Sequence, residues 1–271
     1  MTTTLKVALM QIDLFWEDAQ SNLKAIEEKI HALPLDVDLV ILPEMFTTGF
    51  TMNPSDNAES MSGKTITWMR EIAKEKNLAI TGSIIIKEIT NNLKTTEYFN
   101  RLLFCYPNGD IEYYNKKHTF TLAGENEVYS AGKKRLIINF KGWKLCPLIC
   151  YDLRFPVWSR NTSNYDLLFY VANWPDSRIS AWNSLLKSRA IENMSYTIGV
   201  NRVGKDLNNQ NYTGYSACFD TLGNCMTKDF SNKEAVLITT LNKETQDIQR
   251  ERYNFLADRD GFDLPGINNI L

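Results

Sequence analysis

Histidine is scarce in this sequence, because its 271 residues include only His31 and His118. A metal site built from several histidines is therefore excluded, and a catalytic pair that needs histidine must use one of these two. The cysteines form an odd set with irregular spacing and no Cys-x-x-Cys pair: Cys105, Cys146, Cys150, Cys218 and Cys225. Such a set fits a reducing compartment better than a disulfide framework. We expect no metal and no cofactor.

The sequence has no excess of charge of either sign, since 30 Lys and Arg residues against 32 Asp and Glu residues leave a net charge of −2. This balance argues against a nucleic-acid-binding surface and against an acidic tail. No apolar run approaches the roughly 20 residues that cross a bilayer, so no membrane partner is expected. The first residues lack a basic segment followed by an apolar one, and we therefore expect a cytoplasmic protein.

Short apolar runs alternate with amphipathic stretches along the whole chain. The runs predict strands over 5–10, 39–42, 79–86, 100–106, 111–114, 136–140, 143–150, 167–172, 197–201, 215–219 and 235–240. Apolar residues at three- and four-residue steps predict helices over 18–33, 65–76 and 179–196. Pro147 is discordant within its run, since proline in a strand implies an edge or a bulge.

No linker rich in proline, glycine or serine divides these elements. The alternation predicts one α/β domain over residues 1–271 with a large sheet component. Residues from about 245 to 271 lack regular periodicity, so we expect them to form an extended C-terminal tail.

Glu44 follows a short buried strand and a proline in the segment LVILPEMFTTGF. An acid at the carboxyl end of a strand lies where open α/β sheets usually build their sites. Burial there would raise its pKa towards a value useful for proton transfer. The alternative is an ordinary loop carboxylate or helix cap.

Lys116 and Lys117 follow a strand in IEYYNKKHTF, and His118 comes next. Two adjacent lysines usually mark a solvated strand end, and a single histidine is more often structural than catalytic. A functional lysine here needs another charge nearby, which this segment alone does not show.

Cys150 ends the apolar run of WKLCPLICYDLRFP, whereas Cys146 lies within it. A nucleophile belongs at the exit of a strand, where the thiol reaches solvent and the next backbone N–H can face a substrate oxygen. A disulfide between the two is excluded on a strand, because four residues span about 13 Å, beyond the roughly 7 Å limit between Cα atoms.

Taken together, these segments resemble the nitrilase, or carbon–nitrogen hydrolase, superfamily over nearly the whole chain. LVILPEMFTTGF, YNKKHTF and LICYDLRFP match its glutamate, lysine and cysteine motifs in the family's order. The combination of CYDLRFPVWSRN, YVANWP and NRVG resembles more narrowly the ω-amidase (2-oxoglutaramate amidase) branch. One departure is Thr119, where the family usually has leucine.

The resemblance implies a role for each motif residue. Cys150 corresponds to the nucleophile, Glu44 to the general base and Lys116 to the catalytic lysine, while the backbone N–H of Tyr151 would help hold an oxyanion. Glu125, in the segment GENEVY, corresponds to a second glutamate; Glu127 fits the spacing less well. The implied architecture is a four-layer αββα sandwich that forms a homodimer.

The implied substrate is the ω-amide of a small 2-oxo dicarboxylic acid, cleaved to ammonia and the 2-oxo acid through a cysteine thioester. Its distal carboxylate calls for an arginine or backbone donors. Candidate pocket residues are Phe46, Trp174, Arg178 and Arg202. Each arginine could instead form a structural ion pair, and Arg154 is expected to pair with an acid that holds its loop.

Two other functions remain open from the sequence. The chain could be another carbon–nitrogen hydrolase, such as a nitrilase proper, a carbamoylase or an aliphatic amidase. It could also be a catalytically silent member that binds small molecules or partners, although all three catalytic positions are intact.

Overall fold

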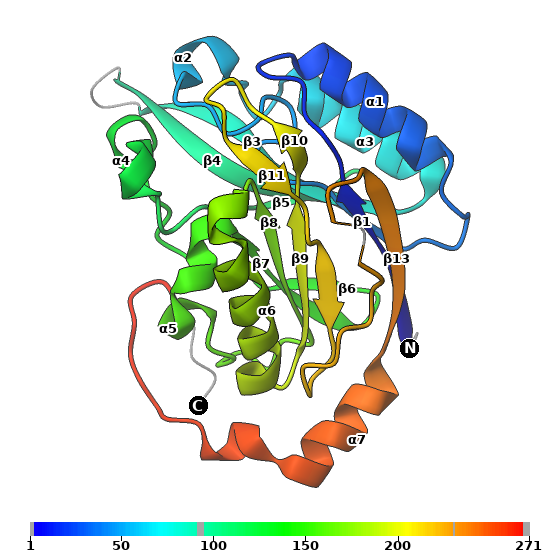
Figure 1. Ribbon diagram of the computed structural model, residues 1–271. Coiled ribbons are helices and arrows are strands. Elements are labelled where there is room, and N and C mark those ends of the chain that lie inside the picture. Colours follow the sequence, from blue (N-terminus) through cyan, green and yellow to red (C-terminus); the bar gives the residue numbers. More distant parts are fainter. Residues whose placement is uncertain (1–2, 91–94, 230, 268–271) are drawn as a thin grey trace.

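Two β-sheets lie face to face between outer helices in the computed structural model, which describes residues 3–90, 95–229 and 231–267 (Figure 1). The first sheet has the strand order β13 (Ala235–Asn242), β1 (Thr4–Gln11), β2 (Leu39–Ile41), β3 (Ala79–Thr90), β4 (Thr95–Cys105) and β5 (Ile111–Asn115). The second has the order β12 (Ala217–Phe219), β9 (Tyr196–Asn201), β8 (Leu167–Ala172), β7 (Trp143–Ile149) and β6 (Ile138–Phe140).

Alternating side chains along β1 explain the layers. Leu5, Val7 and Leu9 enter the core between the sheets, whereas Ala8 and Met10 face the other way. Successive strand residues point to opposite faces of a sheet, so a strand covered on both sides is apolar throughout. This strand therefore lies inside the molecule.

Helices complete the sandwich. On the outer face of the first sheet, α1 (Ala19–His31) and α3 (Lys64–Lys76) lie side by side (Figure 1). Their apolar stripes, such as Ile26 and Ile66, share a core with β1 and β2. On the second sheet lies α6 (Ile179–Asn193), which buries Trp182 and Leu186. The four-layer αββα architecture implied by the resemblance is confirmed.

Shorter elements connect these layers. The remaining helices are α2 (Pro54–Asn57), α4 (Glu125–Val128), α5 (Pro156–Ser159) and α7 (Lys243–Tyr253). Single 3₁₀ turns are η1 (Thr121–Ala123), η2 (Cys150–Arg154), η3 (Asp176–Arg178) and η4 (Phe255–Asp258). A hairpin of β10 (Val203–Lys205) and β11 (Asn211–Thr213) forms a separate two-stranded sheet.

Pro147 lies at a local edge of the sheet, as expected for a proline in a strand, although β7 itself is an interior strand. On one side β7 pairs with β8 along 145–149, and there Pro147 lies opposite Phe169. On the other side β6 reaches only from Trp143 to Leu145. Pro147 therefore lies on a stretch of β7 that has no strand partner on that side, where its missing N–H interrupts no ladder.

The expected extended tail is wrong over its first part, because residues 243–253 form α7. This helix docks through polar contacts, so it lacks the apolar stripe that predicts a helix. Its side chain contacts include Arg250 to Asp166 at 3.0 Å and Gln246 Nε2 to the Asp166 carbonyl at 2.8 Å. The predicted helix over 179–196 also ends early, since Met194 adopts a left-handed conformation and β9 begins at Tyr196.

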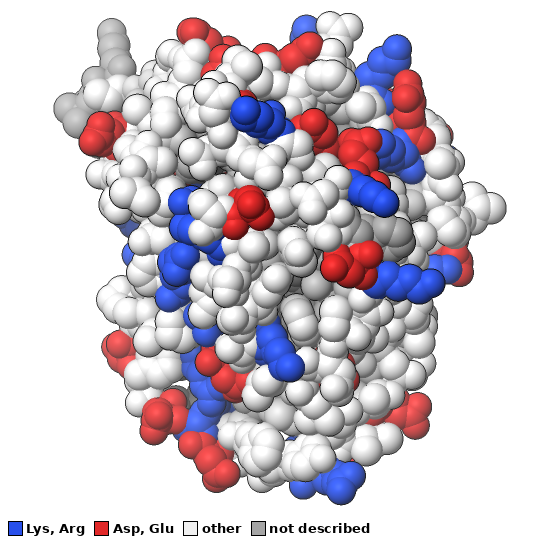
Figure 2. All heavy atoms as spheres, viewed as in Figure 1, with Lys and Arg blue, Asp and Glu red and all other residues white. Residues whose placement is uncertain are grey.

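Charges of both signs share the surface shown in Figure 2, in agreement with the near-neutral composition. Among the residues that the structure describes, no helix is both long enough and apolar enough to cross a membrane.

Candidate active site

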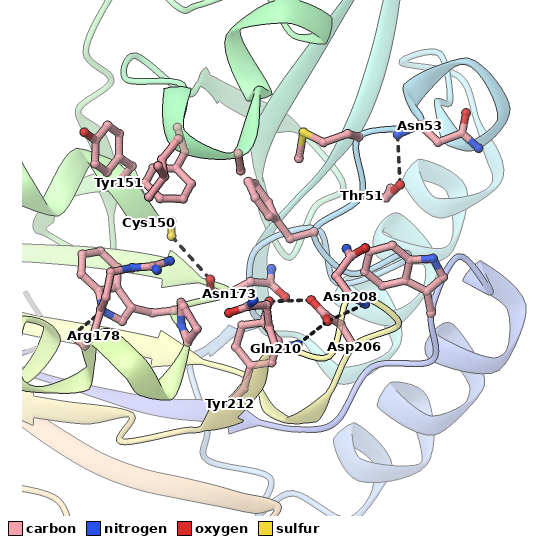
Figure 3. A pocket seen from close by; sticks show the side chains of 18 of the residues that line it. Thr51, Asn53, Cys150, Tyr151, Asn173, Arg178, Asp206, Asn208, Gln210 and Tyr212 are labelled. Atoms are coloured by element: carbon pink, nitrogen blue, oxygen red, sulfur yellow. Dashed lines mark hydrogen bonds between the residues drawn. The ribbon is translucent and has the colours of Figure 1, made fainter.

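The thiol of Cys150 lies at the point where β7 turns into η2. Cys150 has a φ of +44°, in the left-handed region that non-glycine residues rarely adopt. This backbone costs about 1–2 kcal/mol, and such strain clusters at functional sites. The turn directs the half-buried sulfur into a cavity, where Figure 3 shows it facing Asn173. The sulfur lies 4.0 Å from the Asn173 carbonyl oxygen.

Glu44 lies three residues after β2 and is fully buried. Its Oε2 accepts the backbone N–H of Asn173 at 2.8 Å, and the Asn173 side chain donates to the Glu44 carbonyl at 2.6 Å. Because Asn173 directly follows β8, these bonds fasten the end of β2 to the end of β8. The carboxylate is thereby carried from the first sheet to the second, beside the thiol.

Lys116 directly follows β5 and is 1% exposed. Its Nζ lies 2.8 Å from Glu44 Oε1, 2.8 Å from Glu125 Oε2 and 3.0 Å from Glu125 Oε1. Glu125 begins α4 and also accepts the backbone N–H of Phe120 at 2.6 Å. One ammonium therefore serves two buried carboxylates.

The thiol, the lysine and the two glutamates influence one another's pKa values. Burial and the adjacent Glu44 carboxylate raise the pKa of the Cys150 thiol well above its ordinary value, against the opposing effect of Lys116. Burial alone would lower the pKa of Lys116, but Glu125 and Glu44 outweigh it and raise that pKa. Burial also raises the pKa of Glu125, although Lys116 lowers it. The thiol is therefore protonated at rest, and it can ionise only if a neighbour takes its proton.

A third buried carboxylate, Asp152, links the segment of Lys116 to the segment of Cys150. Its Oδ1 accepts the backbone N–H of His118 at 3.0 Å and lies 2.7 Å from the His118 Nδ1. Its Oδ2 accepts the Tyr114 hydroxyl at 2.8 Å and the Ile149 N–H at 3.0 Å. Since Ile149 precedes Cys150 and His118 follows Lys116 by two residues, Asp152 fixes the two segments together.

The cavity in front of Cys150 has a volume of about 580 Å³ (Figure 3). Its walls are rich in aromatic side chains: Trp16, Phe50, Phe120, Tyr151, Trp174 and Tyr212. The charged side chains that line it are Arg154, Arg178 and Asp206. Apolar walls with a few charged groups are typical of small-molecule sites.

The structure brings together most of the predicted site residues. Glu44, Lys116, Glu125 and Cys150 form one cluster, and Tyr151, Trp174 and Arg178 line the cavity. The Arg178 guanidinium lies over the Phe120 ring at 5.2 Å, while the Trp174 indole N–H donates to the Arg178 carbonyl at 2.9 Å.

Two predicted pocket residues lie elsewhere. Phe46 lies in the turn that follows β2 and is buried against Trp68, close to Gly82, whereas Phe50 lines the cavity instead. Arg202 is fully buried and pairs with Asp13 at 2.6 Å, so it is a structural ion pair. Neither residue belongs to the cavity lining.

Arg154 also differs from its expectation, because it pairs with no acid among the described residues. Its guanidinium lies 4.9 Å from the centre of the Trp174 ring and lines the cavity. Three further polar residues support the site and were not predicted from the sequence. Asn100 and Asn173 donate hydrogen bonds to Glu44, and Asp152 accepts the N–H of Ile149, next to Cys150. The signal available for two of them was their position, since Asn173 follows a predicted strand and Asp152 stands two residues after Cys150.

Comparisons with known proteins agree with this geometry. The family model of the carbon–nitrogen hydrolases matches residues 6–250. "Omega-amidase YafV" from Yersinia enterocolitica is 42% identical over 260 residues, covering 96% of this chain and 98% of that protein. "2-oxoglutaramate amidase" from Bacillus subtilis (strain 168) is 31% identical over 222 residues, covering 80% of this chain and 83% of that protein.

A solved structure is similar over the same length. XC1258 from Xanthomonas campestris, described as a CN-hydrolase superfamily protein with an arsenic adduct in the active site, has a TM-score of 0.92 and 39% identity. The match covers 97% of this chain and 100% of that one. The chain therefore belongs to the carbon–nitrogen hydrolase family, and it is a hydrolase of carbon–nitrogen bonds.

Proposed function

We propose that this enzyme is an ω-amidase, which hydrolyses the ω-amide of a small 2-oxo dicarboxylic acid, such as 2-oxoglutaramate or 2-oxosuccinamate, to the 2-oxo acid and ammonia. The observation that carries the proposal is the junction of the Cys150 thiol, the Glu44 carboxylate and the Lys116 ammonium behind an aromatic cavity with two arginines. The names of the two relatives at 42% and 31% identity support the substrate class.

In the first half of the reaction, the Cys150 sulfur forms a bond to the amide carbonyl carbon while its proton passes to Glu44. The Oε2 atom of Glu44 is suited to receive this proton, because it accepts the uncharged Asn173 N–H, whereas Oε1 accepts both Lys116 and Asn100. The Cys150 thiol also hydrogen-bonds to the Glu44 side chain. The Glu44 and Glu125 carboxylates already outnumber the Lys116 ammonium by one negative charge. If Glu44 takes the proton, the thiolate does not add a second. Such transfer by a positioned base contributes about 10²–10⁴ in rate.

The carbonyl oxygen becomes negative as this bond forms. The Lys116 ammonium and the Tyr151 N–H, in the first turn of η2, are the donors that we assign to it. The first N–H groups of a helical turn have no acceptor within the turn, so they are available to a ligand. Loss of one such donor typically costs about 3–4 kcal/mol of barrier.

In the second half, the carbon–nitrogen bond breaks and Glu44 returns its proton to the leaving nitrogen, which departs as ammonia. The acyl group stays on Cys150 as a thioester. Water then attacks the thioester carbon while Glu44 takes a proton from it. The carbon–sulfur bond breaks, the sulfur recovers a proton from Glu44, and the 2-oxo acid leaves.

The two arginines of the cavity are suited to the distal carboxylate of the substrate. Arg154 lies over Trp174, and Arg178 lies over Phe120. Neither guanidinium forms an ion pair with a carboxylate of the described residues, so both can accept an anionic ligand. Arginine binds carboxylates through two parallel hydrogen bonds.

Replacing either arginine by glutamine should raise KM for 2-oxoglutaramate by about 10-fold or more, because a hydrogen bond to a charged group contributes about 1.5–3 kcal/mol. The KM for a neutral aliphatic amide should change much less. Steady-state ammonia release from both substrates measures the difference. Arg252→Gln, which removes an exposed arginine of α7, is the matched control. Equal changes in KM for both amides would contradict carboxylate recognition.

The substrate proposal is tested by comparing ammonia release from 2-oxoglutaramate, glutamine, N-carbamoyl amino acids and simple nitriles. An ω-amidase should favour 2-oxoglutaramate. A preference for a carbamoyl compound or a nitrile would favour the other carbon–nitrogen hydrolases. Hydrolysis of glutamine but not of 2-oxoglutaramate would overturn the proposal.

We also propose that the enzyme acts in the cytoplasm as a homodimer. All five cysteines are unpaired, which suits a reducing compartment. The outer helices carry exposed apolar side chains, including Ile191 of α6 and Ile248 of α7, that a second subunit could cover. Sedimentation equilibrium of the purified enzyme should give twice the mass of one chain.

A further inference from the structure

Asn100 lies in the middle of β4, directly beside the catalytic cluster. The next residue pair along the ladder is Arg101 with Asn115, so Asn100 lies opposite Lys116 at the end of β5. The backbone N–H of Lys116 donates to the Asn100 carbonyl at 2.9 Å. The strand register thus places the amide side chain of Asn100 and the ammonium of Lys116 side by side.

The Asn100 side chain joins the two buried glutamates. Its Nδ2 donates to Glu44 Oε1 at 2.8 Å and to Glu125 Oε1 at 3.1 Å. Lys116 Nζ contacts the same two oxygens at 2.8 and 3.0 Å. Two donors and two carboxylate oxygens therefore form a closed ring, in which Asn100 is the uncharged member.

Stability alone does not explain this asparagine. Both hydrogens of its amide serve carboxylates, which fixes the orientation of the group. Its Oδ1 is buried and has no hydrogen-bond donor among the residues described. A buried acceptor without a donor costs free energy, so the amide is oriented for its two carboxylate partners at the expense of its own oxygen.

We propose that Asn100 is a positioning residue that holds Glu44 and Glu125 in register and stabilises the ionised form of Glu44, so that this carboxylate can take the proton of Cys150. This inference rests on the proposed function of Glu44 as the base. A hydrogen bond to the ionised form of a carboxyl group favours that form. Asn100 provides one without adding a charge.

The other ionisable groups that face Glu44 remain when Asn100 is changed. They are Lys116 after β5, Glu125 of α4, Cys150 of η2 and Tyr129, whose hydroxyl donates to the Thr51 carbonyl. Removal of the Asn100 amide therefore changes one of the two donors to Glu44 Oε1 and leaves the charges of the cluster as they are. Glu44 should then bind its proton more readily.

The test is the pH dependence of kcat/KM for Asn100→Leu and Asn100→Asp with 2-oxoglutaramate. The acidic limb of this profile reports the base of the free enzyme. For Asn100→Leu it should move to higher pH by about one unit. For Asn100→Asp it should move further, because a third carboxyl group joins Glu44 and Glu125. In both variants kcat at pH 7 should fall more than KM changes, since Asn100 is absent from the cavity lining.

Asn161→Leu is the matched control, because Asn161 is equally buried but bonds to the backbone of Tyr165 and Asn193. It should lower the melting temperature without moving the acidic limb. If kcat falls in both Asn100 variants but the acidic limb of the kcat/KM profile stays at the same pH, the inference is overturned and Asn100 has a structural role. If Asn100→Leu does not fold, the smaller Asn100→Ser also removes the amide donor. Its acidic limb in the kcat/KM profile should then shift in the same direction.

Alkylation of Cys150 by iodoacetamide separates this inference from the substrate proposal. It needs proton loss from the same thiol but no substrate. If the unmodified enzyme releases no ammonia from 2-oxoglutaramate, the substrate proposal fails, and the pH profile of the alkylation rate then tests Asn100 by the same expected shift.

Discussion

Replacing Cys150 by alanine should lower kcat/KM for ammonia release from 2-oxoglutaramate by about 10⁴-fold or more. The sulfur is the atom that we assign to carbonyl attack, and Cys150 is the one cysteine among the described residues that line the cavity. The side chain is half-buried and alanine keeps its Cβ atom, so the variant should fold normally. A coupled assay for ammonia measures the loss, and thermal unfolding checks the fold.

Cys225→Ala is the matched control, because Cys225 is the exposed cysteine of the chain. That variant should keep the full rate. Substantial turnover by Cys150→Ala, in a preparation free of the unmodified enzyme, would remove Cys150 as the nucleophile.

Replacing Lys116 by methionine should both inactivate and destabilise the enzyme. Methionine is similar in length, but it leaves the carboxylates of Glu44 and Glu125 buried without their cation. Loss of one partner of a buried ion pair costs about 3–5 kcal/mol of folding free energy. Denaturant unfolding at pH 7 should show a loss of that order.

The pH dependence of this loss has a definite sign. Burial raises the pKa of Glu125 above its ordinary value of 4.5, and Lys116 opposes that rise. Without Lys116 the pKa of Glu125 in the folded state rises further, so the folded state binds protons that the unfolded state has released. The destabilisation relative to the unmodified enzyme should therefore be smallest below pH 4.5 and should grow as the pH rises through the raised value.

The double variant Lys116→Met with Glu125→Gln isolates this electrostatic cause. Removal of one carboxylate should recover part of the stability at pH 7 and weaken the growth of the destabilisation with pH. If the double variant is no more stable than Lys116→Met, and if the destabilisation of both is independent of pH, then loss of packing explains it instead.

The sequence predicted the elements that bury apolar side chains. Apolar runs mark β1, β7 and β8 because these strands are covered on both faces, and the stripe of α1 marks the face that packs on the first sheet. The same reasoning failed for α7, whose contacts with Asp166 are polar. Hydrophobic periodicity reports burial of apolar surface, and a helix that docks through charges does not produce it.

The roles of the motif residues were predictable from the resemblance of their segments to the family, whereas their positions after strands left ordinary alternatives open for Glu44 and Lys116. Residues that act through long-range contacts were not predictable. Arg202 and Arg154 exchanged their expected roles, since Asp13 lies 189 positions from its partner Arg202 and the Trp174 ring lies beside Arg154 only in the fold. Asn100 lies within a strand whose alternation gives no sign that one of its side chains reaches two glutamates.

The most direct test of the central claim is mass spectrometry of the enzyme mixed with 2-oxoglutaramate and quenched in acid within a single turnover. The account predicts a peptide containing Cys150 whose mass is increased by that of the substrate less ammonia, and no such increase in Glu44→Gln, which lacks the base. Release of ammonia without an acylated cysteine, or an acyl group on any other residue, would contradict it.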